Sequence, residues 1–194
     1  MALPYYPTMS VEEYFELDGS SEDRYEYIDG NIYMLAGGSP NHAVIGLNFG
    51  SMLKNLLRGR SCRVYNSDIY FQLAEKRQYV HPDISVSCNA EDHIDPDSIK
   101  YPCLVAEVLS PSTEARDRGR KFGWYRACPS IQEYVLIASE YKEIQIYQRE
   151  KNNLWTLRTF GPEDTVELAR LGVQFAVADV YEDTYFAQEE QEKF

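Results

Sequence analysis

The sequence contains no hydrophobic run close to the roughly 20 residues that a helix needs to cross a membrane. Its first residues, MALPYYPTMS, lack the basic stretch and following apolar stretch of a secretory signal. The four cysteines form no CxxC pair, which argues against a zinc site. We therefore expect a cytoplasmic protein with no membrane anchor, in which the cysteines are reduced thiols and Cys88 and Cys103 are buried in strands.

Positive charge is also scarce, because 19 Lys and Arg residues face 31 Asp and Glu residues, giving a net charge of −12 at pH 7. Proteins that bind nucleic acids are usually basic, at least locally, since neutralising phosphates supplies most of the affinity. The basic residues gather in two clusters, Lys54–Arg63 and Arg116–Arg126. A polyanionic partner would have to meet these two clusters.

The chain shows no internal repeat and no low-complexity linker. Its length of 194 residues and its hydrophobic share of 44% are typical of one globular domain with a sizeable core. We expect a single domain over residues 1–194, with an N-terminal helical segment at 1–23 and a frayed charged tail at 188–194.

The stretch CLVAEVL at residues 103–109 organises the chain. Consecutive apolar residues predict a strand that is covered on both faces, at the centre of a sheet flanked by helices. Glu107 interrupts the run, and an unpaired buried carboxylate costs several kcal/mol, so a cation, a proton or a metal ion must compensate it. Ser112 or Thr113 offers an N-cap for a following helix that carries basic residues.

Other segments complete a predicted fold of mixed strands and helices. A capping box, Ser10 with Glu13, begins a short helix, and Ser39 with Pro40 begins a longer one over about 40–58. Asp29-Gly30-Asn31 predicts a hairpin. We expect two short strands or one bent strand at 62–65 and 68–73, and further strands at 79–87, 131–138, 143–149, 154–160 and 165–168.

Several motifs together resemble a known family. They are YEYIDGNIYMLAGGSPNHAVI, CRVYNSD, HPDISVSC, LVAEVLSPSTEARDRGRKFGWYR and IQEYVLI. Pro82-Asp83, Glu107 and Lys121 are spaced as in the PD-(D/E)XK nuclease superfamily, and within it the chain is similar to the Uma-type restriction endonucleases. The resemblance implies an α/β (mixed α+β) fold with a restriction-endonuclease-like core: a mixed central sheet flanked by helices and extended by antiparallel hairpins.

The resemblance also implies a function and its residues. It implies a Mg²⁺- or Mn²⁺-dependent endonuclease that hydrolyses DNA, often as a homodimer. Asp83, Glu107 and the carbonyl of Val108 would bind the metal ion, because magnesium prefers oxygen ligands. Lys121 would orient or deprotonate the attacking water, and Glu26 would be an accessory acid. Leu109 stands where the superfamily has its lysine, so Lys121 is a relocated lysine, with Arg118 as a competing cation.

Each of these residues also has a purely structural interpretation. Glu107 could form an ion pair with Lys121 or Arg118, and Glu26 could be a cross-strand partner on the hairpin. His42 and Asp68 match family positions, but they could serve in helix capping and in a turn. At the level of function, the alternatives are a catalytically silent module that binds nucleic acid or protein, and a nuclease that acts on RNA or structured DNA.

Overall fold

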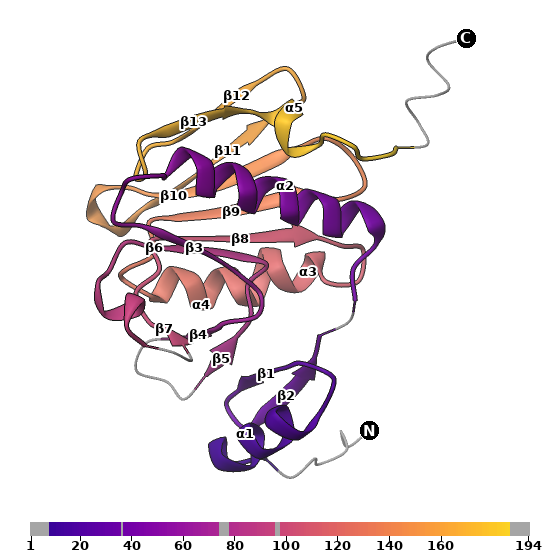
Figure 1. Ribbon diagram of the computed structural model, residues 1–194, viewed down its shortest axis with the longest axis vertical. Helices are drawn as coiled ribbons and strands as arrows, with labels where there is room; N and C mark the ends of the chain where they lie inside the picture. Colours follow the sequence, from indigo (N-terminus) through magenta and orange to yellow (C-terminus); the bar gives the residue numbers. More distant parts are fainter. Residues whose placement is uncertain (1–7, 36, 74–77, 96–97, 187–194) are drawn as a thin grey trace.

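The computed structural model describes residues 8–35, 37–73, 78–95 and 98–186, and the tail predicted at 188–194 lies outside them. A six-stranded sheet with the order β11-β10-β9-β8-β6-β3 forms its centre (Figure 1). The strands are β3 (Arg63–Asn66), β6 (Ile84–Ser87), β8 (Leu104–Leu109), β9 (Glu133–Ala138), β10 (Ile144–Arg149) and β11 (Trp155–Phe160). Because β8 runs parallel to β9 and antiparallel to β6, the sheet is mixed, as predicted.

Helices cover both faces of this sheet. Helix α2 (Pro40–Leu56) lies over one face, and α3 (Glu114–Arg116) and α4 (Phe122–Ala127) lie over the other (Figure 1). Ser39 caps α2 by accepting from the backbone N–H of His42, with Pro40 in the first turn. The hairpin of β12 (Thr165–Leu168) and β13 (Val173–Ala176) and the short α5 (Val177–Val180) pack on the α2 side. The predicted fold class is therefore confirmed.

Strand β8 divides its side chains between two cores. Leu104, Ala106 and Val108 pack into the core beneath α2. Val105 and Leu109 pack into the core beneath α4. Since side chains alternate along a strand, Glu107 points to the α4 side, where the next helix can supply a cation.

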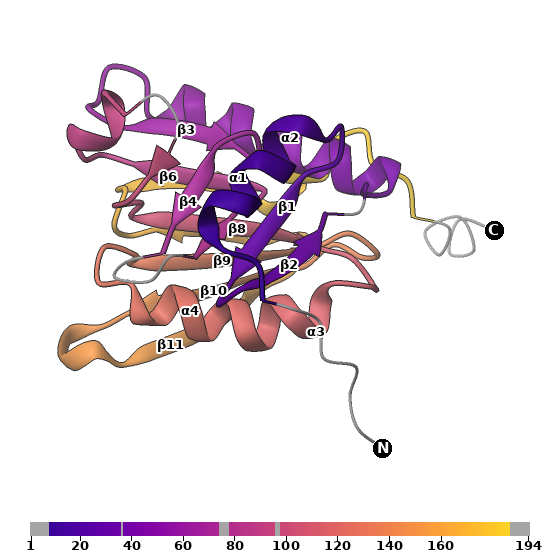
Figure 2. The same ribbon diagram turned by 90° about the horizontal axis from the view of Figure 1, so that it is seen from below.

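A second sheet, of order β2-β1-β5-β4-β7, lies beside the first, with α1 (Val11–Ser20) against it (Figure 2). Its strands are β1 (Tyr25–Ile28), β2 (Asn31–Met34), β4 (Tyr70–Gln72), β5 (Tyr79–Val80) and β7 (Ser98–Ile99). The predicted hairpin is present, with Asp29 and Gly30 at positive φ in its turn. The capping box of Ser10 and Glu13 is present too.

The single strand predicted at 79–87 is wrong, because β5 and β6 belong to different sheets. Pro82 lies between them, and proline has no N–H to continue a ladder of hydrogen bonds. This break places Asp83 immediately before β6, beside the end of β8.

The prediction of four reduced thiols is also wrong, since Cys62 and Cys88 form a disulfide. Strands β3 and β6 pair with Arg63 opposite Ser87, which brings the residues just beyond this pair together. Cys88 is exposed rather than buried, whereas Cys103 is a buried free thiol. The pairing depends on strand register between distant segments, which the sequence spacing does not reveal.

The helical segment that follows β8 is irregular. Between α3 and α4, residues Asp117–Lys121 form a π-helical turn. Thr113 is the N-cap residue of α3, but its side chain makes no capping hydrogen bond. Among the described residues, no helix is long and apolar enough to cross a membrane.

Candidate functional site

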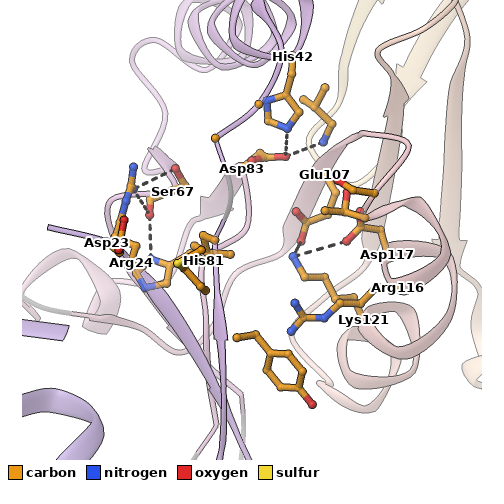
Figure 3. Close-up of a pocket in the computed structure, with 18 of the residues that line it drawn as sticks. Asp23, Arg24, His42, Ser67, His81, Asp83, Glu107, Arg116, Asp117 and Lys121 are labelled. Carbon is orange, nitrogen blue, oxygen red and sulfur yellow. Dashed lines mark hydrogen bonds and ion pairs between the residues drawn. The ribbon is translucent and has the colours of Figure 1, made fainter. Parts of the chain in front are cut away.

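A cavity of about 790 Å³ opens at the carboxyl end of β8. Figure 3 shows its labelled side chains in two groups, with Glu107, Arg116, Asp117 and Lys121 facing Asp23, Arg24, Ser67 and His81, and with His42 and Asp83 between them. The two sheets thus meet across the cavity, and α2 contributes His42 from its first turn.

Asp83 is held between α2 and β8. Its Oδ2 accepts a hydrogen bond from the backbone N–H of Val108 at 2.7 Å. The same oxygen lies 3.4 Å from Nε2 of His42. The bond with Asp83 raises the pKa of His42 against the effect of burial, with a smaller contribution from a backbone hydrogen bond to Val108. His42 and the β8 backbone together fix the direction of the Asp83 carboxylate.

Glu107 is buried and receives two hydrogen bonds on the same oxygen. Lys121 donates to Oε1 at 2.9 Å, and the Tyr125 hydroxyl donates to it at 2.8 Å. Both donors come from the segment that follows β8, one helical turn apart. Oε2 has no hydrogen-bond partner in the described part of the chain. The compensating cation predicted for Glu107 is therefore Lys121.

Glu26 lies behind Lys121 and does not line the cavity. It is completely buried on β1, with Oε1 3.2 Å from Nζ of Lys121. The backbone N–H of His81 donates to the same oxygen at 3.3 Å. Arg116 forms an ion pair with Oε2 at 2.6 Å, without the angles of a hydrogen bond. Glu26 can thus act on the cavity only through its neighbours.

Two members of this cluster are not among the residues selected from the sequence. Asp117 is buried, lines the cavity and lies 3.6 Å from Nζ of Lys121. Arg116 lies over the ring of Tyr33 at 4.3 Å and over that of Trp124 at 5.8 Å. The spacing of Asp117, Lys121 and Tyr125, four residues apart each time, is the signal that could have found Asp117.

Two residues considered from the sequence lie apart from the cluster. Arg118 does not compete for Glu107, because it pairs with Glu114 at 2.7 Å and also donates to Gln145. Asp68 is exposed and pairs with Arg24 at 2.8 Å. Arg24 also donates to the backbone carbonyl of Ser67. The same carbonyl lies 2.8 Å from Nδ1 of His81.

The buried cluster contains more carboxylates than permanent cations. Burial raises the pKa of Glu107 to about 8, Lys121 opposes this shift, and the nearby acids add to it. Burial likewise raises the pKa of Asp117. Burial alone would lower the pKa of Lys121, but Glu107, Glu26 and Asp117 raise it. Lys121 therefore stays charged, and the carboxylates retain capacity for a further positive charge.

The donor set suits a hard divalent cation. Asp83 and Glu107 each keep one oxygen outside the hydrogen bonds given above, and Val108 lines the same cavity. Magnesium accepts such a partial set because it retains several waters. Within the described ranges, no group of three or more His, Cys, Asp and Glu side chains is arranged to hold a metal ion. A metal ion here would thus depend on the backbone carbonyl, water and substrate for its remaining ligands.

Comparison with known proteins gives a consistent result. The family model Uma2, described as "Putative restriction endonuclease", matches residues 11–178. A protein of Synechocystis sp. (strain ATCC 27184 / PCC 6803 / Kazusa), named "Uncharacterized protein slr1290", is 40% identical over 181 residues, covering 93% of this chain and 95% of its own. A second protein of that strain, "Uncharacterized protein sll1609", is 31% identical over 151 residues, covering 77% of this chain and 85% of its own.

A solved structure shares the fold. It is the crystal structure of a "putative nuclease belonging to DUF820" from Anabaena variabilis ATCC 29413. The match has a TM-score of 0.72 and 17% sequence identity, and it covers 89% of this chain and 97% of the other.

Proposed function

The chain belongs to the Uma2 family of restriction-endonuclease-like proteins, and from that premise we propose that it is a Mg²⁺- or Mn²⁺-dependent endonuclease acting on DNA. One observation carries the proposal: Asp83, Glu107 and Lys121, which come from separate elements, line the same cavity. A structural ion pair needs only Lys121 and Glu107, and it leaves the presence of Asp83 and of the open cavity unexplained.

The metal ion would bind between the start of β6 and the carboxyl end of β8. Asp83, Glu107 and the Val108 carbonyl would hold it. When bound, such an ion stabilises the negative charge that develops on a phosphate and lowers the pKa of a coordinated water. His42 would keep the Asp83 carboxylate aimed at this point through the contact at 3.4 Å. Asp83 and Glu107 are therefore assigned to metal binding and His42 to positioning.

Lys121 would orient the attacking water or stabilise the charge of the pentavalent phosphorus. Its raised pKa favours the ammonium form, so it would act as a hydrogen-bond donor and not as a base. Lys121 would take the role of the lysine that the superfamily has at the position of Leu109. Leu109 itself packs into the core beneath α4. Glu26 would position Lys121 from behind, through the contact at 3.2 Å.

Asp83→Asn provides the test, because asparagine keeps the shape of the side chain and removes its charge. We expect the wild-type protein to bind Mn²⁺ in calorimetry and to nick supercoiled plasmid in the presence of Mn²⁺. Asp83→Asn should abolish both, while Glu163→Gln, a substitution of an exposed acid outside the cavity, should leave both unchanged. Cleavage of equal rate by Asp83→Asn would refute the assignment of the site.

The same assay separates the alternative functions. Supercoiled plasmid, single-stranded DNA and RNA are compared under identical conditions. Cleavage of RNA alone would identify RNA as the substrate and exclude DNA. Mn²⁺ binding without cleavage of any of the three would favour the catalytically silent module, which the net charge of −12 also favours. The homodimer stays a prediction, and sedimentation of the purified protein tests it.

A further inference from the structure

A second cavity, of about 500 Å³, lies between α4 and the β10–β11 hairpin. Phe122 and Arg126 line it from α4, and Tyr147, Asn153 and Trp155 line it from the hairpin. It shares no lining residue with the first cavity. With 3.6 residues per turn, the positions of Phe122 and Arg126 lie on a different side of the helical segment from Lys121. In Figures 1 and 2 the turn of this hairpin lies near the carboxyl end of α4.

Aromatic rings form the walls of this cavity. Phe122 and Tyr147 stack with their centroids 4.1 Å apart. Trp155 meets Phe122 edge to face, with centroids 5.6 Å apart. All three rings are only partly buried. Gly123 leaves the entrance open, since a Cβ added there would meet nothing within 4 Å.

Two arginines, Arg126 in the lining of the cavity and Arg149 beside Trp155, have no carboxylate partner among the residues that the structure describes. Arg149 lies 4.5 Å from the ring centroid of Trp155, and its other contacts are to Asn153 and to backbone carbonyls, including those of Ile131 and Cys128. Arg126 is exposed and lies 5.7 Å from the ring of Phe122. In a chain with a net charge of −12, an arginine without a carboxylate partner in the lining of an aromatic cavity, Arg126, favours an anionic ligand.

A hydrogen-bond donor adds to the site. Arg149 donates to the side-chain oxygen of Asn153, so the amide nitrogen of Asn153 is directed elsewhere and has no acceptor among the described residues. A ligand with acceptor atoms in the cavity would accept from this amide, since Asn153 lines the cavity.

We propose that this cavity binds a single nucleotide unit, with the base against the aromatic walls and the phosphate beside Arg126. A nucleobase has a flat π face for stacking and ring acceptors for Asn153, and the attached phosphate matches the guanidinium group of Arg126. The site does not depend on the proposed endonuclease activity. A free mononucleotide and an unpaired nucleotide of a nucleic acid share this chemistry.

Calorimetric titration in EDTA tests the proposal, because removing divalent metal prevents cleavage. The probes are adenosine monophosphate, inorganic phosphate, a short single-stranded DNA and its duplex. We expect the nucleotide to bind more tightly than phosphate. Arg126→Gln should weaken this binding at least tenfold, and Gly123→Leu, which fills the entrance and suits a helix, should abolish it. Arg120→Gln removes the same charge at an exposed position outside both cavities and should have no effect.

The probes also distinguish the sources of the nucleotide. Binding of adenosine monophosphate alone identifies a free nucleotide as the ligand. Binding of the single strand with higher affinity than the duplex identifies an unpaired nucleotide of a nucleic acid. The proposal is overturned if no probe binds, if phosphate binds as tightly as the nucleotide, or if Gly123→Leu leaves binding unchanged while circular dichroism shows a folded protein.

Discussion

Glu107→Gln should change how the stability of the protein depends on pH. Glutamine keeps the length of the side chain and an oxygen that can accept from Lys121 and Tyr125, which both donate to Oε1 of Glu107. The substitution therefore removes one titratable group with little change in packing. The difference between the two proteins then reports the protonation of this carboxyl group in the folded state.

The sign follows from the direction of the pKa shift. Burial raises the pKa of Glu107 from an ordinary 4.5 to about 8, so between these values the folded protein binds more protons than the unfolded chain. The free energy of unfolding should then fall as pH rises through this window. One proton corresponds to at most about 1.4 kcal/mol per pH unit, so Glu107 should account for a loss of about 2 kcal/mol between about pH 5.5 and about pH 7.5.

Urea unfolding in EDTA at a series of pH values measures this effect. In Glu107→Gln the decline with pH should be shallower than in the wild type, and the two proteins should differ least at low pH, where Glu107 is neutral as glutamine is. Glu114→Gln is the matched control, because Glu114 is a half-exposed acid that pairs with Arg118 outside the cluster. Parallel curves for wild type and Glu107→Gln would refute the conclusion that this carboxyl group holds a proton near neutral pH.

Two further predictions concern stability. Lys121→Met leaves Glu26, Glu107 and Asp117 without their shared cation, so urea unfolding at pH 8 should show a loss of about 3–5 kcal/mol, and this loss should shrink at pH 6, where Glu107 takes up a proton. Unchanged stability at both pH values would contradict it. Replacing Cys62 and Cys88 together by serine removes a cross-link between residues 26 apart and should cost about 3 kcal/mol, and wild-type protein unfolded with a reductant should match the variant.

The sequence predicts the central part of the fold well, for a physical reason. An unbroken apolar run requires cover on both faces, and β8 has it from α2 and α4. A carboxylate in such a run requires a partner, and the helical segment that follows supplies Lys121. Both inferences follow from local sequence, because exposing the apolar strand or burying an unpaired carboxylate would cost several kcal/mol.

The parts that the sequence does not predict depend on contacts between distant segments. The disulfide depends on the register of β3 and β6, and the split at Pro82 depends on which sheet each half joins. Arg116 and Arg118 are two residues apart with the same charge, yet Arg116 turns to Glu26 and Arg118 to Glu114. The phase of an irregular helix decides between them, and residue type does not reveal this phase.

The π-helical turn at Asp117–Lys121 has a consequence for how this segment tolerates insertions and deletions. A π turn accommodates one residue more than an α turn between the same two ends. Gly119 is exposed, and a Cβ added there would meet nothing within 4 Å. Deletion of this residue would convert the π turn into a regular α-helical turn. That helix would rotate Arg116 and Asp117 by about 100° relative to Lys121 and Tyr125. An improvement in local helical geometry would therefore dismantle the charged cluster.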